Sequence, residues 1–264
     1  MKPLSTRLLN ALLKRIAGTI THVVTDEAVV ALTFDDGPDP VFTPDILKIL
    51  AAHGARATFF MCGERAAAYP ELVAEVRAAG HAIGNHSWDH PSFPLIPRRE
   101  RILQLRHCAK VLQGANSCLF RPPYGHQTAA SRVDVWLTGH QVVMWNVEVP
   151  DWEDHDGQWL ANRAMQQVSA GSIILMHDGL YDVMHDRQFD RGPTLGAVET
   201  ILTQLGSRYD FVTLPELLQR GTPVRVNWLM KPDIGFLNRL VRKAGPARRY
   251  DVSKEKKPWL AYNR

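Results

Sequence analysis

Apolar and polar residues alternate along this chain in blocks that predict repeated strand and helix units from residue 29 onward. Short β-branched or apolar runs predict strands. These runs are residues 29–34, 57–61, 81–84, 118–121, 142–147, 172–176 and 211–213. Runs with apolar residues three and four positions apart predict helices at residues 43–53, 70–79, 98–112, 129–138, 158–169 and 195–205.

The order of these units predicts an α/β fold. Strands that alternate with helices are typical of a parallel sheet with right-handed crossovers. About seven such units indicate an incomplete barrel, a distorted (β/α)7 arrangement, and 264 residues suit one large domain of that kind. A glycine follows each helical run, where a left-handed cap residue is expected. These glycines are Gly54, Gly80, Gly114, Gly139, Gly171 and Gly206.

Charge divides the chain into three parts. Residues 1–25 carry a formal charge of +4, residues 26–221 carry −8 and residues 222–264 carry +8, within a total of +4. We therefore predict an N-terminal helix within residues 1–25, a catalytic barrel over 26–221 and a basic C-terminal extension over 222–264. An acidic body with two basic ends is not the pattern of a nucleic-acid groove, so no nucleic-acid partner is expected.

The two basic ends also suggest contact with an anionic membrane. In residues 4–16 the apolar side chains fall on one helical arc, which either packs on the barrel or lies in a membrane interface. Near the C-terminus apolar residues stand beside many lysines and arginines, which an anionic lipid surface attracts. Peripheral contact through residues 1–20 and 222–264 is one expectation. A packed helix and a solvated tail are the alternative.

Cysteine usage and hydropathy predict a cytoplasmic protein. Cys62, Cys108 and Cys118 are an odd number without metal-ligand spacing, which favours a reducing compartment. No secretory leader pattern is present, and no apolar run approaches the roughly 20 residues that cross a bilayer. Association with the inner face of the membrane would be consistent with the basic ends.

Residues capable of chemistry follow the ends of the predicted strands. Because parallel strands end at one edge of a sheet, we expect these side chains to gather there. They are Asp35, Asp36, His86, His90, Arg121, Tyr124, Glu148, Asp151, Trp152, His177 and Asp178.

Asp35 and Asp36 are adjacent carboxylates after an apolar run, and Gly37-Pro38 then forces a turn. Two close carboxylates repel each other unless a cation or an arginine lies between them. A turn with solvated aspartates is the simpler interpretation, and only the rest of the chain argues against it.

His86 and His90 can bind one metal ion if their segment makes a helical turn, although such a pair alone is often coincidental. With one aspartate they form a set that leaves coordination positions open, and zinc bound in this way lowers the pKa of water to about 7. The other aspartate can then accept the proton of the attacking water. His177 is either structural or the acid that protonates a departing amine.

Five ordered motifs resemble those of the polysaccharide deacetylase family, which includes nodulation chitooligosaccharide deacetylases, chitin deacetylases and peptidoglycan deacetylases. The resemblance covers roughly residues 29–218. The motifs are Thr33-Phe34-Asp35-Asp36-Gly37-Pro38, His86-Ser87-Trp88-Asp89-His90, Arg121-Pro122-Pro123-Tyr124-Gly125, Asp151-Trp152 and Leu175-Met176-His177.

The resemblance implies a distorted barrel of about seven strands and metal-dependent removal of an N-acetyl group from a sugar. It implies that Asp35 is the general base and that Arg121 orients it. Three further roles are implied for groups of residues. Asp36, His86 and His90 are implied to bind a divalent metal, usually Zn²⁺, with Co²⁺, Mn²⁺ or Ni²⁺ as alternatives. His177 is implied to be the general acid, with its pKa tuned by Asp151. The Tyr124 N–H is implied to stabilise the oxyanion, and Trp152 and Leu175 to line the acetyl pocket.

Two departures from the family pattern stand out. Glu148 replaces an aspartate that often begins the fourth motif, which puts the support of that loop in question. The polar loop between His177 and Thr194 is long and is expected to border the cleft, where it would help to select the substrate.

These observations predict a metal-dependent deacetylase acting on an N-acetylhexosamine unit of an oligosaccharide, polysaccharide or lipid-linked glycan. One rival is a deformylase, or another deacylase, of a lipid-linked amino sugar. The other is a non-catalytic barrel that binds glycan or scaffolds a membrane assembly. Metal-free amidohydrolases with this type of barrel have little use for an Asp-His-His set.

Overall fold

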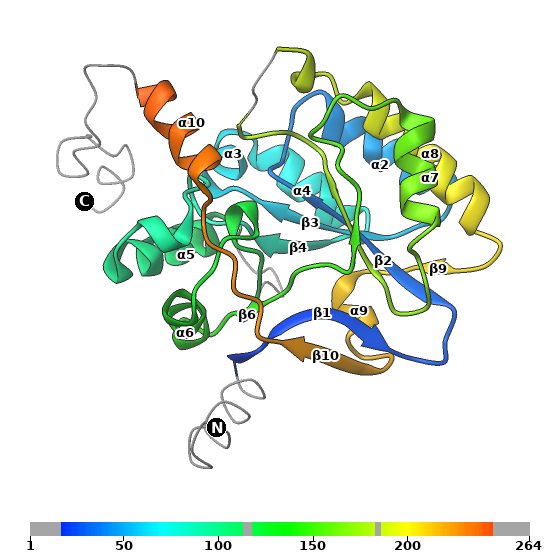
Figure 1. Ribbon diagram of the computed structural model, residues 1–264. Helices are drawn as coiled ribbons and strands as arrows, with labels where there is room; N and C mark the ends of the chain where they lie inside the picture. The colour runs from blue at the N-terminus through cyan, green and yellow to red at the C-terminus, as the bar shows by residue number, and fades with distance from the viewer. Residues whose placement is uncertain (1–16, 113–117, 183–185, 245–264) are drawn as a thin grey trace.

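The structure, a computed structural model of the chain, describes residues 17–112, 118–182 and 186–244. Its centre is a curled sheet of parallel strands with helices on the outside (Figure 1). Within these described residues, seven strands follow one another in the order β6, β5, β4, β3, β2, β8 and β7, and β9 pairs with the first two residues of β2. This architecture confirms the predicted incomplete (β/α)7 barrel.

The strands of the sheet are β2 (Val29–Asp35), β3 (Ala57–Met61), β4 (Ala82–Asn85), β5 (Leu119–Phe120), β6 (Gln141–Val142), β7 (Val147–Glu148), β8 (Ile173–His177) and β9 (Asp210–Phe211). The helices around it are α2 (Phe42–Ala52), α3 (Gly63–Ala68), α4 (Pro70–Ala78), α5 (Arg98–Val111), α6 (Ala129–Leu137), α7 (Gly157–Met165), α8 (Gly192–Leu205) and α9 (Leu214–Leu217). Short 3₁₀ turns occur at η1 (Phe93–Leu95), η2 (Pro123–Gly125) and η3 (Asp186–Phe189).

The central strands are buried on both faces. Every residue of β2 and of β3 is buried, as expected for parallel strands that helices cover. Phe34 and Phe59 stack at 5.1 Å between ring centroids, and the apolar faces of α2 and α8 pack against the same core through Leu50 and Ile201. This core fixes the strand ends that carry the site.

The predicted strand 142–147 is wrong, because this run forms two strands on opposite edges of the sheet. β6 ends at Val142 and β7 begins at Val147, so the chain between them crosses the gap in the barrel. Asn146 ends the crossing: its N–H donates to the Ile173 carbonyl at 3.2 Å, and its Oδ1 accepts the Ile173 N–H at 2.8 Å. These two hydrogen bonds pair the backbone groups at the end of the crossing, although no continuous strand ladder runs from β6 to β7.

Two strands that the sequence did not predict lie over this gap. β1 (Thr19–Val24) and β10 (Thr222–Val226) pair antiparallel. The buried Ile20 of β1 bridges to Val143, and the Val23 N–H donates to the Gly171 carbonyl at 3.0 Å. Described parts of both basic end segments therefore pack on the barrel.

Four of the predicted left-handed glycines are confirmed, with φ between +60° and +82° at Gly54, Gly80, Gly139 and Gly171. Gly171 has a second constraint, because a Cβ there would lie 1.8 Å from the Val23 carbonyl oxygen of β1. Gly206 was predicted wrongly: its φ is −64°, since its N–H continues α8 by donating to Leu202. Gly114 lies outside the described residues.

Several expectations fall outside the described residues or stay untested. The helix predicted within residues 4–16 and the tail beyond residue 244 are not described, so the predicted division at 25/26 and 221/222 stays a prediction. Among the residues that the structure does describe, no helix is long and apolar enough to cross a membrane.

Candidate active site

The carboxyl ends of β2, β4, β5, β7 and β8 meet at one edge of the curled sheet, and the predicted site residues follow those ends. Asp35 and His177 are the last residues of β2 and β8 and are partners in the parallel register of the two strands. Partners in register project to the same face of a sheet. The two side chains that were predicted to move protons therefore lie on neighbouring strands.

Asp36, His86 and His90 form a compact buried group. Asp36 Oδ1 lies 3.1 Å from His86 Nε2 and 3.0 Å from His90 Nε2. One ligand atom from each residue lies within 4.8 Å of the others, and within the described ranges no second group of three such side chains comes as close. The three residues predicted to bind one ion are thus brought together.

The histidines converge through a loop and not through the helical turn that the sequence suggested. Ser87 and His90 have left-handed backbones with φ of 68° and 56°, and Asp36 has φ of 74°. Such conformations cost about 1–3 kcal/mol each outside glycine. Asn85 Oδ1 accepts the Ser87 N–H at 2.9 Å, and Gln104 Oε1 accepts the next two backbone N–H groups at 2.8 and 3.1 Å. These bonds hold the loop in place.

The protonation pattern of this group fits a divalent cation. His86 Nδ1 lies 2.8 Å from the Arg121 carbonyl oxygen and must donate to it, because a carbonyl only accepts. His86 Nε2 then faces Asp36 Oδ1 at 3.1 Å, and apart from the two histidines this buried oxygen has no polar partner among the described residues. Burial raises the pKa of Asp36, but His90 and His86 outweigh it and hold that pKa well below its usual value. A carboxylate and two imidazole nitrogens around one point are zinc-type donors.

Arg121 holds Asp35 inside the barrel. Its side chain is fully buried, and Nη1 donates to Asp35 Oδ1 and to Thr33 Oγ1, both at 2.8 Å. Nε and Nη2 donate to the Val143 and Met144 carbonyl oxygens at 3.2 and 3.0 Å. The guanidinium therefore links the end of β2 to the crossing segment between β6 and β7, and it fixes one oxygen of Asp35.

Arg121→Ala is expected to lower the free energy of unfolding by about 3–5 kcal/mol, because it leaves the Asp35 carboxylate buried without its partner. Urea denaturation measures this change. Arg98→Ala is the matched control: Arg98 pairs with Asp134 at 3.0 Å, but its side chain is 63% exposed, so the loss should stay below about 1 kcal/mol. Equal losses in the two variants would contradict this account of Arg121.

Asp151 orients His177 with both carboxylate oxygens. His177 Nδ1 lies 2.7 Å from Oδ1, and the His177 backbone N–H donates to Oδ2 at 2.9 Å. Burial lowers the pKa of His177, but the Asp151 carboxylate raises this pKa by a larger amount. The pKa of His177 therefore lies above its usual value. Nδ1 is occupied by Asp151, which leaves Nε2 as the nitrogen that can exchange a proton with a substrate.

Arg191 supports this pair, a role that the sequence did not reveal. Arg191 belongs to the polar loop between His177 and Thr194, which was expected to border the cleft. Its side chain is buried, and its Nη2 donates to Asp151 Oδ2 at 2.6 Å. Its Nη1 donates to the Asp151 carbonyl at 2.8 Å, and Thr194 Oγ1 donates to Asp151 Oδ2 at 3.1 Å. Burial raises the pKa of Asp151, while Arg191 and His177 bring it below its usual value.

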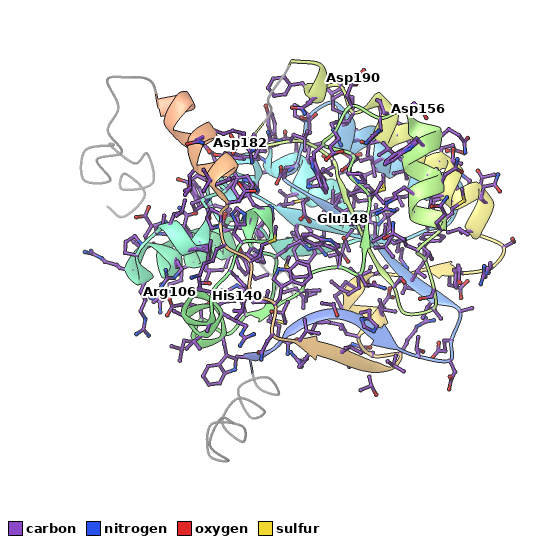
Figure 2. The ribbon with its side chains drawn as sticks, viewed as in Figure 1. Arg106, His140, Glu148, Asp156, Asp182 and Asp190 are labelled. Atoms are coloured by element: carbon purple, nitrogen blue, oxygen red, sulfur yellow. The ribbon has the colours of Figure 1, made fainter. Side chains whose placement is uncertain are left out.

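Tyr124 and Tyr181 flank the buried histidine His90. The Tyr124 ring meets His90 edge-on at 4.4 Å, its backbone is left-handed, and its hydroxyl donates to Asp182 (Figure 2). Tyr181 stacks on His90 at 5.1 Å, and its backbone N–H donates to Asp36 Oδ2 at 2.8 Å. This N–H engages one carboxylate oxygen of Asp36 and leaves Oδ1 for an ion. A backbone donor has no signal in the sequence.

Two further predicted site residues, Trp152 and Leu175, lie near His177. Trp152 meets the His177 ring edge-on at 5.4 Å. Leu175 is buried two residues before His177 on β8, hence on the same face of the strand. Glu148 is exposed at the end of β7 (Figure 2). Trp152 and Leu175 are thus placed near His177, and their role as the wall of an acetyl pocket stays a prediction.

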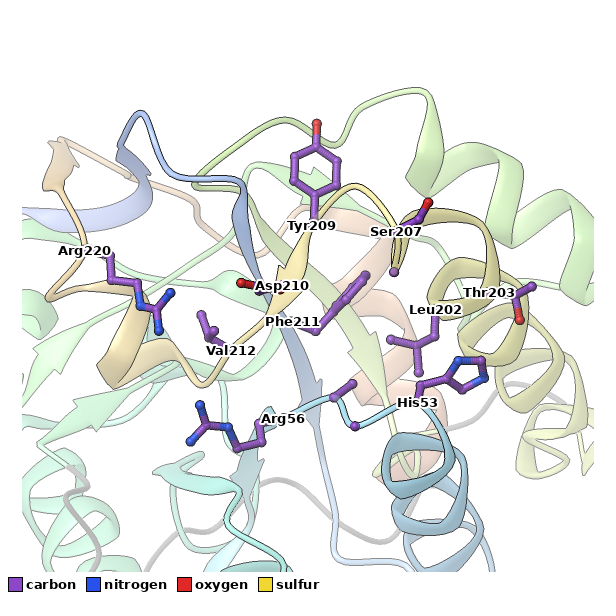
Figure 3. Close-up of a pocket in the computed structure, with 13 residues that line it drawn as sticks. His53, Arg56, Leu202, Thr203, Ser207, Tyr209, Asp210, Phe211, Val212 and Arg220 are labelled. Atoms are coloured by element: carbon purple, nitrogen blue, oxygen red, sulfur yellow. The ribbon is translucent and has the colours of Figure 1, made fainter.

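A cavity of about 510 Å³ lies at the opposite, amino ends of the strands, between α8, β9 and the turn after α2 (Figure 3). His53, Arg56 and Arg220 line it. Each has an acidic partner: Glu199 at 2.9 Å, Glu216 at 2.6 Å and Glu27 at 3.4 Å respectively. It contains none of the convergent groups described above, so we do not assign the reaction to it.

Comparisons with known proteins identify similar families and folds. The family model "Polysaccharide deacetylase" matches residues 22–143. A peptidoglycan-N-acetylglucosamine deacetylase of Bacillus cereus is 35% identical over 209 residues, which cover 75% of this chain and 92% of that protein. A chitooligosaccharide deacetylase of Azorhizobium caulinodans is 34% identical over 202 residues, which cover 73% of this chain and 95% of that protein.

Solved structures show the same fold. The crystal structure of the Bc1960 peptidoglycan N-acetylglucosamine deacetylase matches with a TM-score of 0.70 and 29% identity, over 85% of this chain and all of that one. A Bacillus anthracis protein described as a CE4 family pseudoenzyme matches with a TM-score of 0.68 and 25% identity, over 76% of this chain and 69% of that one. Proteins with this fold therefore include both a named deacetylase and a named pseudoenzyme.

Proposed function

The chain belongs to the polysaccharide deacetylase family, and its named relatives include deacetylases of peptidoglycan and of chitooligosaccharides. We propose that it removes the N-acetyl group from an N-acetylhexosamine unit of a glycan. The observation that carries the proposal is the placement of Asp35 and His177 on neighbouring strand ends, with Asp36 following Asp35 directly. A base, an acid and a cation site at one edge are the parts that amide hydrolysis needs.

Asp36, His86 and His90 would hold the divalent cation, and Zn²⁺ is our proposal for it. The donor set supports this choice, since two imidazole nitrogens and one carboxylate oxygen suit zinc and leave positions open. When bound, such a cation supplies a Lewis acid that polarises the amide carbonyl and lowers the pKa of water. The Arg121 carbonyl that accepts from His86 Nδ1 keeps His86 Nε2 directed at the site.

Asp35 and His177 would carry the two proton transfers. Asp35 accepts a proton from water as the water oxygen bonds to the acyl carbon, and Arg121 keeps this carboxylate in position. His177 then donates a proton to the amide nitrogen as the C–N bond breaks, which releases acetate and leaves the sugar with a free amine. The backbone N–H of Tyr124 would donate to the oxyanion, while Trp152 and Leu175 would enclose the acetyl methyl group.

Asp151→Asn is expected to move the alkaline limb of the kcat profile to lower pH. His177 acts while protonated, so activity falls as pH rises through its pKa, which Asp151 holds above the usual value. Without the Asp151 charge, burial dominates and lowers the pKa of His177. A pH series of acetate release measures the shift, with Asp156→Asn at the N-cap of α7 as the control. An unmoved limb would show that Asp151 does not tune His177.

The nature of the acyl group and of the glycan is tested by product analysis. We expect acetate release from N-acetylglucosamine oligomers and no formate release from formylated amino sugars. Formate as the preferred product would instead support a deformylase of a lipid-linked amino sugar. A protein that binds glycan but releases neither acid would be a non-catalytic barrel. Mass spectrometry of soluble and lipid-linked glycans, with active protein and with Asp35→Asn, identifies the substrate.

Lipid-linked glycans on the inner leaflet are part of the proposed substrate range. The proposal draws on the cytoplasmic location and the basic ends predicted from the sequence, neither of which the fold or the relatives address. Mass spectrometry of the two glycan pools distinguishes this range from soluble oligosaccharides.

A further inference from the structure

Exposed apolar side chains concentrate in one short stretch near the end of the described chain. Leu229, Met230, Ile234 and Leu237 are 60%, 44%, 77% and 39% exposed. The last two belong to α10 (Ile234–Ala244), which projects from the body at one side of the barrel (Figure 1). We call residues 229–239 the C-terminal patch. Other exposed large apolar residues are scattered over the chain, which is normal for a protein surface.

The C-terminal patch is fixed to the barrel by hydrogen bonds and ring contacts on its inner side. Met230 and Gln127 exchange backbone hydrogen bonds at 2.7 and 3.1 Å, and Trp228 Nε1 donates to the Gly125 carbonyl at 3.1 Å. The buried Phe236 meets the rings of Tyr124 and His126 edge-on at 4.7 and 4.8 Å. The patch therefore has a defined orientation, with Phe236 facing inward and Ile234 facing out.

These contacts also place the patch next to the candidate active site. Tyr124, which Phe236 touches, lies against the predicted metal ligand His90. A partner that binds the patch would therefore sit beside the Tyr124 side of the site.

The charge around the exposed apolar residues is positive. Lys231 and Arg239 are exposed within the patch, and the Arg239 guanidinium carbon lies 5.7 Å from the Phe236 ring centroid. The one acid, Asp233, accepts the Phe236 N–H at 2.6 Å with Oδ1. The sequence continues with Arg242 and Lys243 in α10. Apolar residues flanked by cations are the pattern of a helix that lies in a lipid interface.

We infer that the C-terminal patch docks on an anionic lipid surface, with Ile234 and Leu237 inserted among the headgroups and Lys231 and Arg239 beside the phosphates. Charge favours this occupant: residues 229–244 carry a formal charge of +3 and the sequence after them is also basic, so a like-charged tail or second copy is a poorer partner than an anionic surface. A nucleic acid would leave the apolar residues in water. Within residues 222–264, for which membrane contact was expected, this inference assigns the contact to the exposed side of the C-terminal patch. Binding itself does not depend on the proposed deacetylation.

Vesicle sedimentation with the full chain tests the inference. The probes are vesicles of phosphatidylcholine alone and of phosphatidylcholine mixed with phosphatidylglycerol. We expect binding to the mixed vesicles and at least about tenfold weaker binding to the neutral ones. Ile234→Glu/Leu237→Glu should weaken binding to mixed vesicles by at least about tenfold. Lys231→Gln should weaken it by about fivefold.

Val41→Glu/Leu137→Glu is the matched control, because these side chains are 59% and 53% exposed elsewhere on the barrel. It should change vesicle binding less than about twofold. Acetate release from a soluble oligosaccharide should be equal in all four proteins, which shows that they are folded. The inference is overturned if mixed vesicles do not bind the wild type, or if the Ile234/Leu237 variant binds as tightly as the control.

Discussion

Asp35→Asn is expected to lower the rate of acetate release by about 10²–10⁴-fold while the purified protein keeps its divalent cation. The amide that replaces the carboxylate cannot accept the proton of the attacking water. The asparagine side chain has nearly the same shape as that of aspartate. Its amide oxygen can therefore replace Asp35 Oδ1, to which Arg121 Nη1 donates at 2.8 Å. The proposed ligands Asp36, His86 and His90 are untouched.

Acetate release and metal content measured on one preparation check this expectation. Asp45→Asn is the control, since Asp45 forms an exposed pair with Lys48 on α2 and should leave both readings unchanged. Full activity in Asp35→Asn would show that another group is the base. Loss of metal in this variant would show that Asp35 is a ligand and that the roles of the two aspartates need exchanging.

His86→Ala is expected to lose both metal and activity. It removes one of the three proposed ligands and also the hydrogen bond to the Arg121 carbonyl, which directs the ring. Loss of a group that only hydrogen-bonds to a metal ligand already costs about 10–100-fold in metal affinity, so loss of a ligand itself should cost more than about 100-fold. Competition with a chelating dye measures the affinity without any reference to turnover.

His155→Ala serves as the control for this second variant, because His155 stacks on Trp159 at 3.7 Å, away from the three proposed ligands. It should bind metal like the wild type. If His86→Ala bound metal with wild-type affinity, the group formed by Asp36, His86 and His90 would not be the metal site. The contrast between Asp35→Asn and His86→Ala separates proton transfer from metal binding.

The sequence predicts the central strands because burial on both faces makes them continuous apolar runs. β3 was predicted with its observed bounds, and β2 and β8 end within one residue of the prediction. The edge strands β6 and β7 have two residues each, too few to show any periodicity. β1 and β10 lie in the two basic end segments, for which the sequence predicted a helix and a basic extension. β10 also contains a proline, which argues against a strand.

The site was predictable as a set of residues but not as a geometry. Position after a strand identifies Asp35, His86 and His177, because parallel strands end at one edge. The left-handed backbone of His90 and the Tyr181 N–H on Asp36 arise from loop conformation, which residue types do not encode locally. Arg191 stands in a polar loop, where nothing in the pattern indicates burial against Asp151.

We propose that hydrolysis of the N-acetyl group requires a divalent cation bound by Asp36, His86 and His90. The most direct measurement follows acetate release from an N-acetylglucosamine oligomer, with metal content, before chelation, after chelation and after Zn²⁺ is added back. We predict one cation per chain, loss of acetate release with loss of the cation, and recovery on addition of Zn²⁺. Acetate release at the full rate from metal-free protein would contradict the account.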